Sequence, residues 1–320
     1  ESWLVYLMQA HQQAEKVADR FASAEFELQI GLLYRLMSRF QEARVWTNAS
    51  VDHFVALNSS EGERRALNEL AWLEQLQHEY DSATLHVQRA LQLAQDDDLE
   101  RGMSYRVLGM IANSQRKWQE AQAYHEQALA IFERCGDQRR IAWGLQNLAL
   151  SLSEQLELTK AMALYRQAIQ IFEERRDYYH RSICEMNLGV AHFRLHEYEA
   201  SLSQLTNAAN TFHLLSDTLN IARVATNLGT CYYALHHYQA AEQSFLTAIT
   251  SYAALGDIAW KLNAVAGLGM TYIADRQHVK ASTILQQGLR EIEQIKEHPY
   301  YHSIAGYLQQ YLAQAQQGQE

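Results

Sequence analysis

Proline is almost absent from this sequence, with 1 in 320 residues. Average usage is about 5%, and proline interrupts helices, so this scarcity predicts long helices and excludes collagen-like and proline-rich chains. Cysteine is scarce too: Cys135, Cys184 and Cys231 are odd in number and far apart. A disulfide framework is therefore excluded, and a reducing, cytoplasmic location is expected.

Positive charge is also in short supply. The chain has 27 Lys and Arg against 37 Asp and Glu, a net charge of -10, and no run of basic residues. Phosphate contacts need clustered Lys and Arg, so direct nucleic-acid binding is not expected. No apolar run approaches the roughly 18 residues that span a bilayer, and the opening Glu1-Ser2-Trp3 is unlike a signal peptide. No membrane partner is expected.

The sequence does contain an internal repeat. A large aliphatic residue followed by a small one recurs at intervals of 40, 38, 40, 40, 40 and 40 residues, as Ile30-Gly31, Leu70-Ala71, Leu108-Gly109, Leu148-Ala149, Leu188-Gly189, Leu228-Gly229 and Leu268-Gly269. Periods of 20 to 50 residues are typical of solenoids, in which each unit buries its apolar face against its neighbours.

Two further small residues follow each pair, seven positions apart. The first set is Ala43, Ala83, Ala121, Ala161, Ser201, Ala241 and Ala281. The second set is Ser50, Ala90, Ala128, Ala168, Ala208, Ala248 and Gly288. This spacing places both on one helix face, where a small side chain lets another helix approach closely. Each unit is therefore predicted to be an antiparallel helix pair.

Turn signals separate these helices. Aromatic residues follow the break within a pair, at Phe40, Tyr80, Trp118, Tyr198 and Tyr238. Between pairs the helix is expected to stop at Gly136-Asp137, Arg176-Asp177, Ser216-Asp217 and Gly256-Asp257, because glycine takes the left-handed position after a helix and aspartate caps the next one. Asp96, Asp97 and Asp98 are expected to form a similar, solvated turn at the single 38-residue interval.

These units resemble the tetratricopeptide repeat family. The best match is Leu228-Gly229-x-x-Tyr232 followed by Ala241-x-x-x-Phe245, and the resemblance covers roughly residues 23 to 298. It implies an all-α fold, a right-handed superhelical solenoid of antiparallel helix pairs.

The chain departs from the family pattern in lacking the tryptophan near the start of the unit and the proline that usually ends the second helix. Without that proline the second helix runs on, which lengthens the repeat from 34 toward 40 residues. This longer form resembles the arrays found in bacterial multidomain transcription regulators and signal-transduction ATPases.

The repeat register predicts three regions. Residues 1–22 are expected to be the second helix of a preceding repeat, because the third small position projects back onto Ala10. Residues 23–298 are expected to hold seven helix pairs. Residues 299–320 are expected to form a capping helix opened by Pro299, with a glutamine-rich face, or else the first helix of a further repeat.

In this family the first helix of each pair lines the concave groove, and the resemblance assigns the inward positions. They include five arginines and three glutamates, namely Arg35, Arg65, Arg106, Arg194 and Arg223, and Glu25, Glu69 and Glu154. The groove is thus about +2 in a chain of -10. Arginine suits planar, bidentate recognition of carboxylates.

Asn147, Asn187 and Asn227 recur at one inward position. The matching asparagine contacts the peptide backbone in peptide-binding members of the family, and an amide offers both donors and an acceptor. The alternative is that each asparagine bonds to the neighbouring repeat. Arg194 and Arg223 flank this row and either bind a ligand carboxylate or remain solvated or paired within the helix.

Aromatic residues complete the candidate groove. Trp72, Trp143, Phe193 and Tyr233 are either binding anchors or core residues, since aromatic residues serve both roles. The candidate ligand-binding set is Asn147, Asn187, Asn227, Arg194, Arg223, Trp143, Phe193, Tyr233 and Arg106.

Catalytic motifs are missing. The sequence has no Gly-rich phosphate loop, nucleophile elbow or Cys-x-x-Cys, and nothing interrupts the repeat to build a catalytic pocket. His192 with His196, and His298 with His302, are spaced for metal binding, but neither pair has the intervening glutamate of a zinc-protease helix. We expect no enzyme, no cofactor and no metal.

The first hypothesis is a binding module for a protein or peptide partner, serving as the sensor or docking part of a larger regulator. The second is a structural scaffold that self-associates through its ends or outer surfaces. The third is a small-molecule sensor in which Trp143, Phe193 and Tyr233 stack on the ligand.

Overall fold

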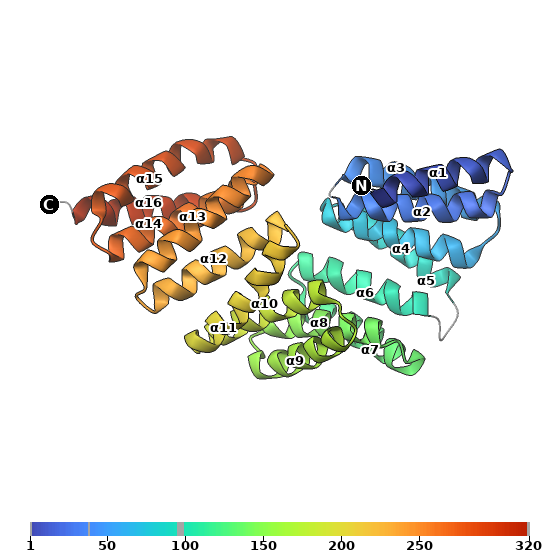
Figure 1. Ribbon diagram of the computed structural model, residues 1–320, viewed down its shortest axis with the longest axis horizontal. Coiled ribbons are helices and arrows are strands. Elements are labelled where there is room, and N and C mark those ends of the chain that lie inside the picture. The colour runs from blue at the N-terminus through green and yellow to red at the C-terminus, as the bar shows by residue number, and fades with distance from the viewer. Residues whose placement is uncertain (1, 38, 95–98, 319–320) are drawn as a thin grey trace. The chain divides into compact units, whose positions relative to one another are not determined.

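A computed structural model describes residues 2–37, 39–94 and 99–318, and within them the chain is helical with no strand (Figure 1). Asp96, Asp97 and Asp98, where a solvated turn is expected, lie outside the described residues. The elements are α1 (Ser2–Lys16), α2 (Arg20–Leu36), α3 (Phe40–Ala56), α4 (Ser60–Leu76), α5 (Tyr80–Leu93), α6 (Leu99–Ser114), α7 (Trp118–Cys135), α8 (Gln138–Glu154), α9 (Leu158–Glu174), α10 (Tyr178–Arg194), α11 (Tyr198–Leu214), α12 (Thr218–Ala234), α13 (Tyr238–Leu255), α14 (Ile258–Ala274), α15 (His278–Glu291), the 3-10 helix η1 (Ile292–Ile295) and α16 (Tyr301–Gln317).

The helices group into two compact units, Glu1–Leu164 and Tyr165–Glu320, called unit 1 and unit 2 below. Unit 1 contains α1, the pairs α2–α3, α4–α5 and α6–α7, then α8 and the start of α9. Unit 2 contains the rest of α9, the pairs α10–α11, α12–α13 and α14–α15, and finally η1 and α16. The expected all-α architecture of tandem antiparallel helix pairs is confirmed.

Close packing at the small residues joins the two helices of a pair. Ala43, Ala121, Ser201 and Ala241 are completely buried. A Cβ atom built on Gly31 would lie 3.3 Å from the carbonyl oxygen of Ala43, which leaves little space for any side chain there. The repeat register therefore reflects helix-to-helix contact.

The turns between pairs follow the capping pattern expected from the sequence. Gly136 and Gly256 adopt left-handed φ angles of 69° and 71°, as glycine readily does. The aspartate that precedes each of four first helices accepts a hydrogen bond from the backbone N–H three residues ahead. The distances are 3.0 Å (Arg140 to Asp137), 3.3 Å (His180 to Asp177), 3.0 Å (Asn220 to Asp217) and 3.1 Å (Trp260 to Asp257). These bonds satisfy N–H groups that have no partner within the helix.

The turns inside the pairs use the left-handed conformation without glycine. Their φ values are 59° to 64°, at His78, Arg116, Leu156, His196, His236 and Arg276. A side chain disfavours this conformation, so the strain at these positions is offset by the packing of the two helices that each turn connects.

The first helices of successive pairs form a continuous layer in each unit. In unit 1, α2 contacts α4, α4 contacts α6 and α6 contacts α8, whereas α3 and α5, or α5 and α7, do not contact each other through described residues. In unit 2 the contacts run from α10 to α12, α14 and α16. The exposed side of this layer is called the inner face of each unit below.

The C-terminal helix continues this layer. It begins at Tyr301, so Pro299 lies in the preceding turn and does not open the helix as expected. Leu308 of α16 is completely buried and lies against Gly288 of α15, while α16 also packs on α14. Thus α16 occupies the place of a further first helix, and its expected glutamines are exposed: Gln309, Gln310, Gln314, Gln316 and Gln317.

Candidate ligand-binding faces

Two ion pairs neutralise most of the charge on the inner face of unit 1. Arg35 of α2 binds Glu69 of α4 through both carboxylate oxygens, with Nη2 3.3 Å from Oε2, and both residues are buried. Arg65 of α4 pairs with Glu25 of α2. Two of the five groove arginines are therefore already bound to two of the three groove glutamates, which the sequence count alone does not reveal.

Arg106 of α6 lies between two indole rings. Its guanidinium carbon is 4.7 Å from the centroid of Trp72 on α4 and 5.0 Å from that of Trp143 on α8. Arg35 covers Trp72 at 3.9 Å, and Arg139 covers Trp143 at 5.1 Å. These residues form a stack in which arginine and tryptophan alternate along neighbouring first helices, held by cation–π attraction.

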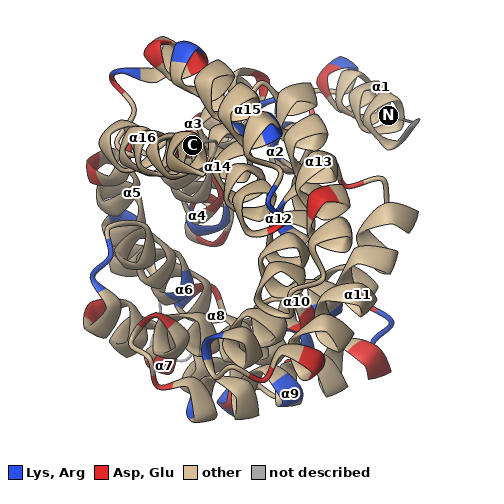
Figure 2. Ribbon diagram, turned by 90° about the vertical axis from the view of Figure 1, so that its left-hand side faces the viewer, with Lys and Arg blue, Asp and Glu red and all other residues tan. Residues whose placement is uncertain are grey.

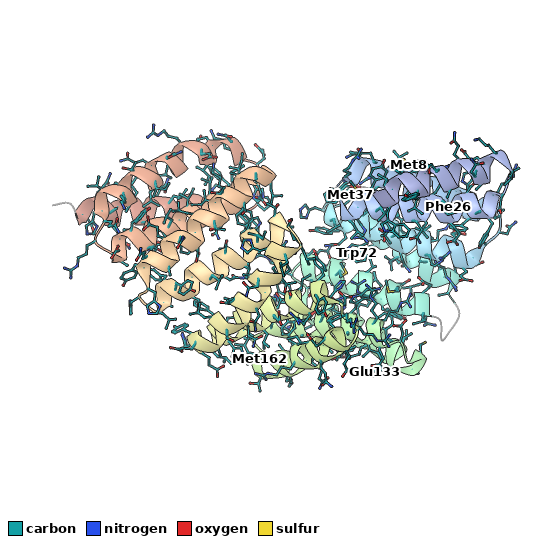
Figure 3. All side chains as sticks on the ribbon, in the orientation of Figure 1. Met8, Phe26, Met37, Trp72, Glu133 and Met162 are labelled. Carbon is teal, nitrogen blue, oxygen red and sulfur yellow. The ribbon has the colours of Figure 1, made fainter. Side chains whose placement is uncertain are left out.

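Figure 3 labels Trp72 where α4 passes α6, and Figure 2 shows basic residues on both helices. Only 5% of Arg106 is exposed, and its Nε and Nη1 groups donate to no acceptor among the described residues. Burial, with smaller effects from the charges of Arg35 and Arg140, lowers the pKa of Arg106 to about 10, and the charge of Glu69 acts in the opposite direction. Arg106 is thus a buried cation without a hydrogen-bonded counter-ion among those residues.

The first member of the asparagine row lies beside this stack. Asn147 is one helical turn after Trp143 on α8, so the two share a face. Asn147 is 8% exposed, and its Nδ2 group has no hydrogen-bond partner in the described structure. The expectation that this asparagine bonds to a neighbouring repeat through its side-chain N–H is therefore not met.

The other two asparagines lie in unit 2. Asn187 on α10 and Asn227 on α12 are both half-buried, and neither side chain makes a hydrogen bond to another described residue. Arg194 and Arg223 are exposed. The inner face of unit 2 therefore carries amides that are available to hydrogen-bond with a ligand.

Phe193 and Tyr233 both pack within unit 2. The ring of Phe193 lies 5.4 Å from that of Tyr198, and the ring of Tyr233 lies 6.2 Å from that of Tyr238. Both side chains are half-buried, and burial raises the pKa of Tyr233. Each ring thus supports the turn of its own helix pair and leaves only part of its surface for a ligand.

The structure adds tyrosines that the sequence analysis missed. Tyr307 and Tyr311 of α16 stack with centroids 6.3 Å apart. They line a cavity of about 160 Å³ on the inner face of unit 2, together with Thr226, Thr230, Phe245, Asn263, Ala266, Gly267 and Met270. Tyr307 stands 40 residues after Gly267 and 80 after Asn227, so extending the repeat register would have identified its position.

The first of the two spaced histidine pairs, His192 and His196, has other partners. His192 Nδ1 lies 2.5 Å from a carboxylate oxygen of Glu197, and His196 Nδ1 lies 2.8 Å from the Tyr198 hydroxyl. Within residues 2–37, 39–94 and 99–318, no three His, Cys, Asp or Glu side chains gather as a metal site requires. Nor does any helix in those ranges combine the length and apolar character needed to cross a bilayer.

Comparison with known proteins supports the repeat assignment. A tetratricopeptide repeat family model matches residues 100–174 and 182–254. No curated protein matches the chain.

Solved structures share the fold at low sequence identity. A signal-transduction ATPase with numerous domains and a tetratricopeptide repeat sensor, from Pyrococcus horikoshii, superposes with a TM-score of 0.74 at 14% identity. That match covers 99% of this chain and 50% of the ATPase, so the chain spans half its length.

The quorum sensor NprR provides two further matches. Its apo form, from B. thuringiensis, has a TM-score of 0.66 at 13% identity and covers 92% of this chain and 80% of NprR. NprR in complex with its cognate peptide NprX has a TM-score of 0.62 at 13% identity, with 89% and 82% covered. The family model thus identifies residues 100–174 and 182–254 as tetratricopeptide repeats, and the solved structures show that the chain shares the fold of such repeat proteins.

Proposed function

We propose that this chain is a non-catalytic binding module that holds a peptide segment of a partner protein on its inner helix face. It would serve as the sensor or docking part of a larger cytoplasmic regulatory protein. The peptide complex of NprR and the repeat sensor of the Pyrococcus ATPase support this proposal by analogy of fold.

The observation that carries the proposal is the unused hydrogen-bonding capacity of the asparagine row. Asn147 has a buried Nδ2 group without a partner, and Asn187 and Asn227, which are half-buried, make no side-chain hydrogen bond to the rest of the described chain. Half-buried amides that bond to no other part of the described chain are open to an external ligand, which favours binding over a structural role for Asn187 and Asn227. A peptide backbone supplies the alternating C=O and N–H groups that an amide can pair with.

A small-molecule sensor is the second candidate, because two tyrosines of α16 help to line a cavity in unit 2. Its volume of about 160 Å³ is below the roughly 300–1,000 Å³ of ligand pockets. The cavity alone would therefore accommodate only part of a drug-sized molecule, and the peptide remains the preferred ligand.

The test is a pull-down with the full chain, comparing wild type with the double variant Asn187→Ala, Asn227→Ala. Mass spectrometry would identify the retained peptides, proteins and small molecules. The matched control is Asn207→Ala, Asn210→Ala, which changes two exposed asparagines on α11, a second helix of the same unit. We expect a partner to be lost from the first variant and kept by the control, with thermal stability nearly unchanged in both.

Other outcomes would redirect the assignment. A large fall in the melting temperature of the Asn187→Ala, Asn227→Ala variant would make these residues structural. Equal retention by all three proteins, or concentration-dependent self-association without a partner, would replace the peptide-binding proposal with a scaffold.

A further inference from the structure

Unit 2 exposes a row of large apolar side chains along one edge. Among its described residues twelve such side chains are exposed, and eight of them lie at the turns between helix pairs, where second helices end and first helices begin. Six of the eight are Tyr179, Leu214, Leu215, Leu219, Leu255 and Trp260. Tyr178 and Tyr300 extend the row at its two ends. Because the two helices of each pair are antiparallel, all these turns fall on the same side of the helix layers.

Contacts between neighbouring first helices show that the row is continuous. At one end, Asn220 Nδ2 of α12 donates to the Tyr179 hydroxyl of α10 at 3.4 Å, and the Tyr179 ring lies 6.4 Å from that of Phe212. At the other end, the ring of Trp260 on α14 lies 6.0 Å from that of Tyr300, directly before α16. The first helices of the middle, α12 and α14, contact each other. The eight side chains therefore form one surface, called the apolar edge below.

The same repeat position carries charge in unit 1. Tyr179 and Leu219 are the second residues of α10 and α12, whereas the second residues of α4, α6 and α8 are Glu61, Glu100 and Arg139. The helix pair itself therefore does not require an apolar side chain at this position. The apolar edge is a property of unit 2 that the repeat fold leaves unexplained.

The size of the apolar edge matches that of a protein interface. If a fully exposed side chain of this size presents roughly 150–250 Å², the exposed fractions of the eight residues correspond to roughly 600–1,000 Å². The largest apolar patch on a typical monomer is about 300–600 Å², whereas a stable interface buries about 800 Å² on each partner. A second protein surface of similar area is thus expected to cover this edge.

The order of the residues along the edge selects a second copy of this chain. Aromatic residues occupy both ends, and the leucines lie between them. Leu215 and Leu255 occupy the same position in adjacent repeats, 40 residues apart. If two copies run in opposite directions, aromatic ends meet aromatic ends and Leu215 of one copy lies opposite Leu255 of the other. A twofold contact requires such a self-complementary surface.

Charge does not call for a different partner. The aspartates at these turns, Asp177, Asp217 and Asp257, already accept hydrogen bonds from the N–H groups of the helices they cap. Lys261, next to Trp260, pairs with Glu291. These charges are therefore engaged within the chain, and apolar contact is what the edge offers.

We propose that two copies of this chain associate through the apolar edge, about a twofold axis between α12 and α14. The association needs no ligand on the inner face, so it is independent of the proposed peptide binding. It places two copies of unit 2, each with its own inner face, in one assembly.

The experiment is sedimentation equilibrium of the full chain, without added ligand, from about 1 to 100 μM. The test variant is Leu215→Lys, Leu255→Lys. Leu215 caps α11 and Leu255 is the last residue of α13, where a positive charge suits the helix dipole, so we expect this variant to fold as wild type does. The matched control is Leu195→Lys, Leu246→Lys, which changes two leucines of unit 2 that are exposed to a similar extent away from the apolar edge.

We expect wild type and the control to form dimers with a dissociation constant in the micromolar range or below. The test variant should raise this constant at least about tenfold, because lysines then face lysines across the axis. Leu215→Glu, Leu255→Glu should dissociate in the same way. An equimolar mixture of the lysine and glutamate variants should associate again, since opposite charges then face each other only in the mixed dimer.

Several results would overturn the proposal. A wild type that stays monomeric throughout this range removes the dimer, and if the lysine variant then also loses a protein from the pull-down, the apolar edge belongs to that other partner. A test variant that associates as wild type does places the contact elsewhere. Dissociation of the control together with the test variant, or a mixture that stays monomeric, contradicts a twofold contact at this edge.

Leu214→Lys covers the case in which a double variant fails to fold. The Leu214 side chain is 86% exposed, so its replacement removes no contact from the folded core. We expect this single variant to keep the melting curve of wild type and to weaken the dimer severalfold. An unchanged dissociation constant in Leu214→Lys would contradict the proposed interface.

Discussion

His125 makes the stability of this protein depend on pH in a direction that the structure specifies. Its ring is completely buried on α7 against Gly109 of α6. Asn113 Nδ2 donates to His125 Nε2 at 3.2 Å, and the Asn113 Oδ1 atom accepts a hydrogen bond from the Ser151 hydroxyl at 3.0 Å. Burial, and then the charge of Arg106, lower the pKa of His125 to about 3. The folded chain therefore holds this ring neutral.

The magnitude follows from proton linkage. An unfolded histidine has a pKa of about 6.5, so between pH 6.5 and about 3 the unfolded chain binds a proton that the folded chain does not. The contribution of His125 to the free energy of unfolding is therefore complete above pH 6.5 and falls by about 1.4 kcal/mol per pH unit below it. Between pH 8 and pH 5 the loss is about 2 kcal/mol.

The substitution that tests this is His125→Leu, because other repeats have leucine at the position of His125. Leu205 and Leu285 occupy the same repeat position and lie against Gly189 and Gly269, as His125 lies against Gly109. Leucine should therefore fit beside the glycine while removing the titrating group. The hydrogen bond from Asn113 is lost at every pH, so it does not contribute to the difference between two pH values.

The assay is urea denaturation of both proteins at pH 8, 7, 6 and 5. We expect the fall in unfolding free energy from pH 8 to pH 5 to be about 2 kcal/mol smaller in His125→Leu than in wild type. Proton NMR provides a second measurement. The resonance of the His125 ring, identified because the variant lacks it, should keep its chemical shift in wild type down to about pH 4. Equal pH dependence in the two proteins, or a midpoint near 6.5 for that resonance, would refute the reasoning.

Three further predictions concern packing, capping and charge. Gly229→Leu should destabilise the protein by about 1–3 kcal/mol or more, because a Cβ there would lie 2.9 Å from the Phe245 ring; unchanged urea unfolding would mean that the repeat register is wrong. Asp217→Ala should cost about 1 kcal/mol because it removes the cap of α12, and amide hydrogen exchange in the first turn of α12 should become faster. Exchange as slow as in wild type would show that the cap does not contribute to stability. Arg35→Gln should cost about 3–5 kcal/mol in urea denaturation because it leaves Glu69 buried without its partner, and a cost below about 1 kcal/mol would show that water reaches this pair.

The local sequence pattern was sufficient to predict the helix pairs and their turns. Gly136 and Asp137, for example, carry enough information to end one helix and begin the next, because capping depends on residues that are neighbours in the chain. The pattern did not identify a left-handed residue where no glycine is present, as at His78, since that conformation is stabilised by the packing of the helices α4 and α5 that it joins. Pro299 was expected to open the last helix, whereas α16 begins at Tyr301.

The candidate site was identified from the sequence only as a set of positions. The sequence placed Arg106, Trp143 and Asn147 on inward-facing positions and left open whether each binds a ligand or supports the core. It also assigned a charge of about +2 to the groove, and it singled out Arg194 and Arg223, which flank the asparagine row, as candidates for a ligand carboxylate.

Tertiary structure decided which of these charges is left unpaired. Arg35 and Glu69 are 34 residues apart, and Arg65 and Glu25 are 40 apart, so each pair forms only when adjacent first helices pack side by side. The same packing places Arg106 between two tryptophans from neighbouring helices, where no described carboxylate binds it. The 40-residue period determines which helix faces pack against each other. The length and rotamer of each side chain, together with the water excluded around it, determine which partners pair and which donor remains for a ligand.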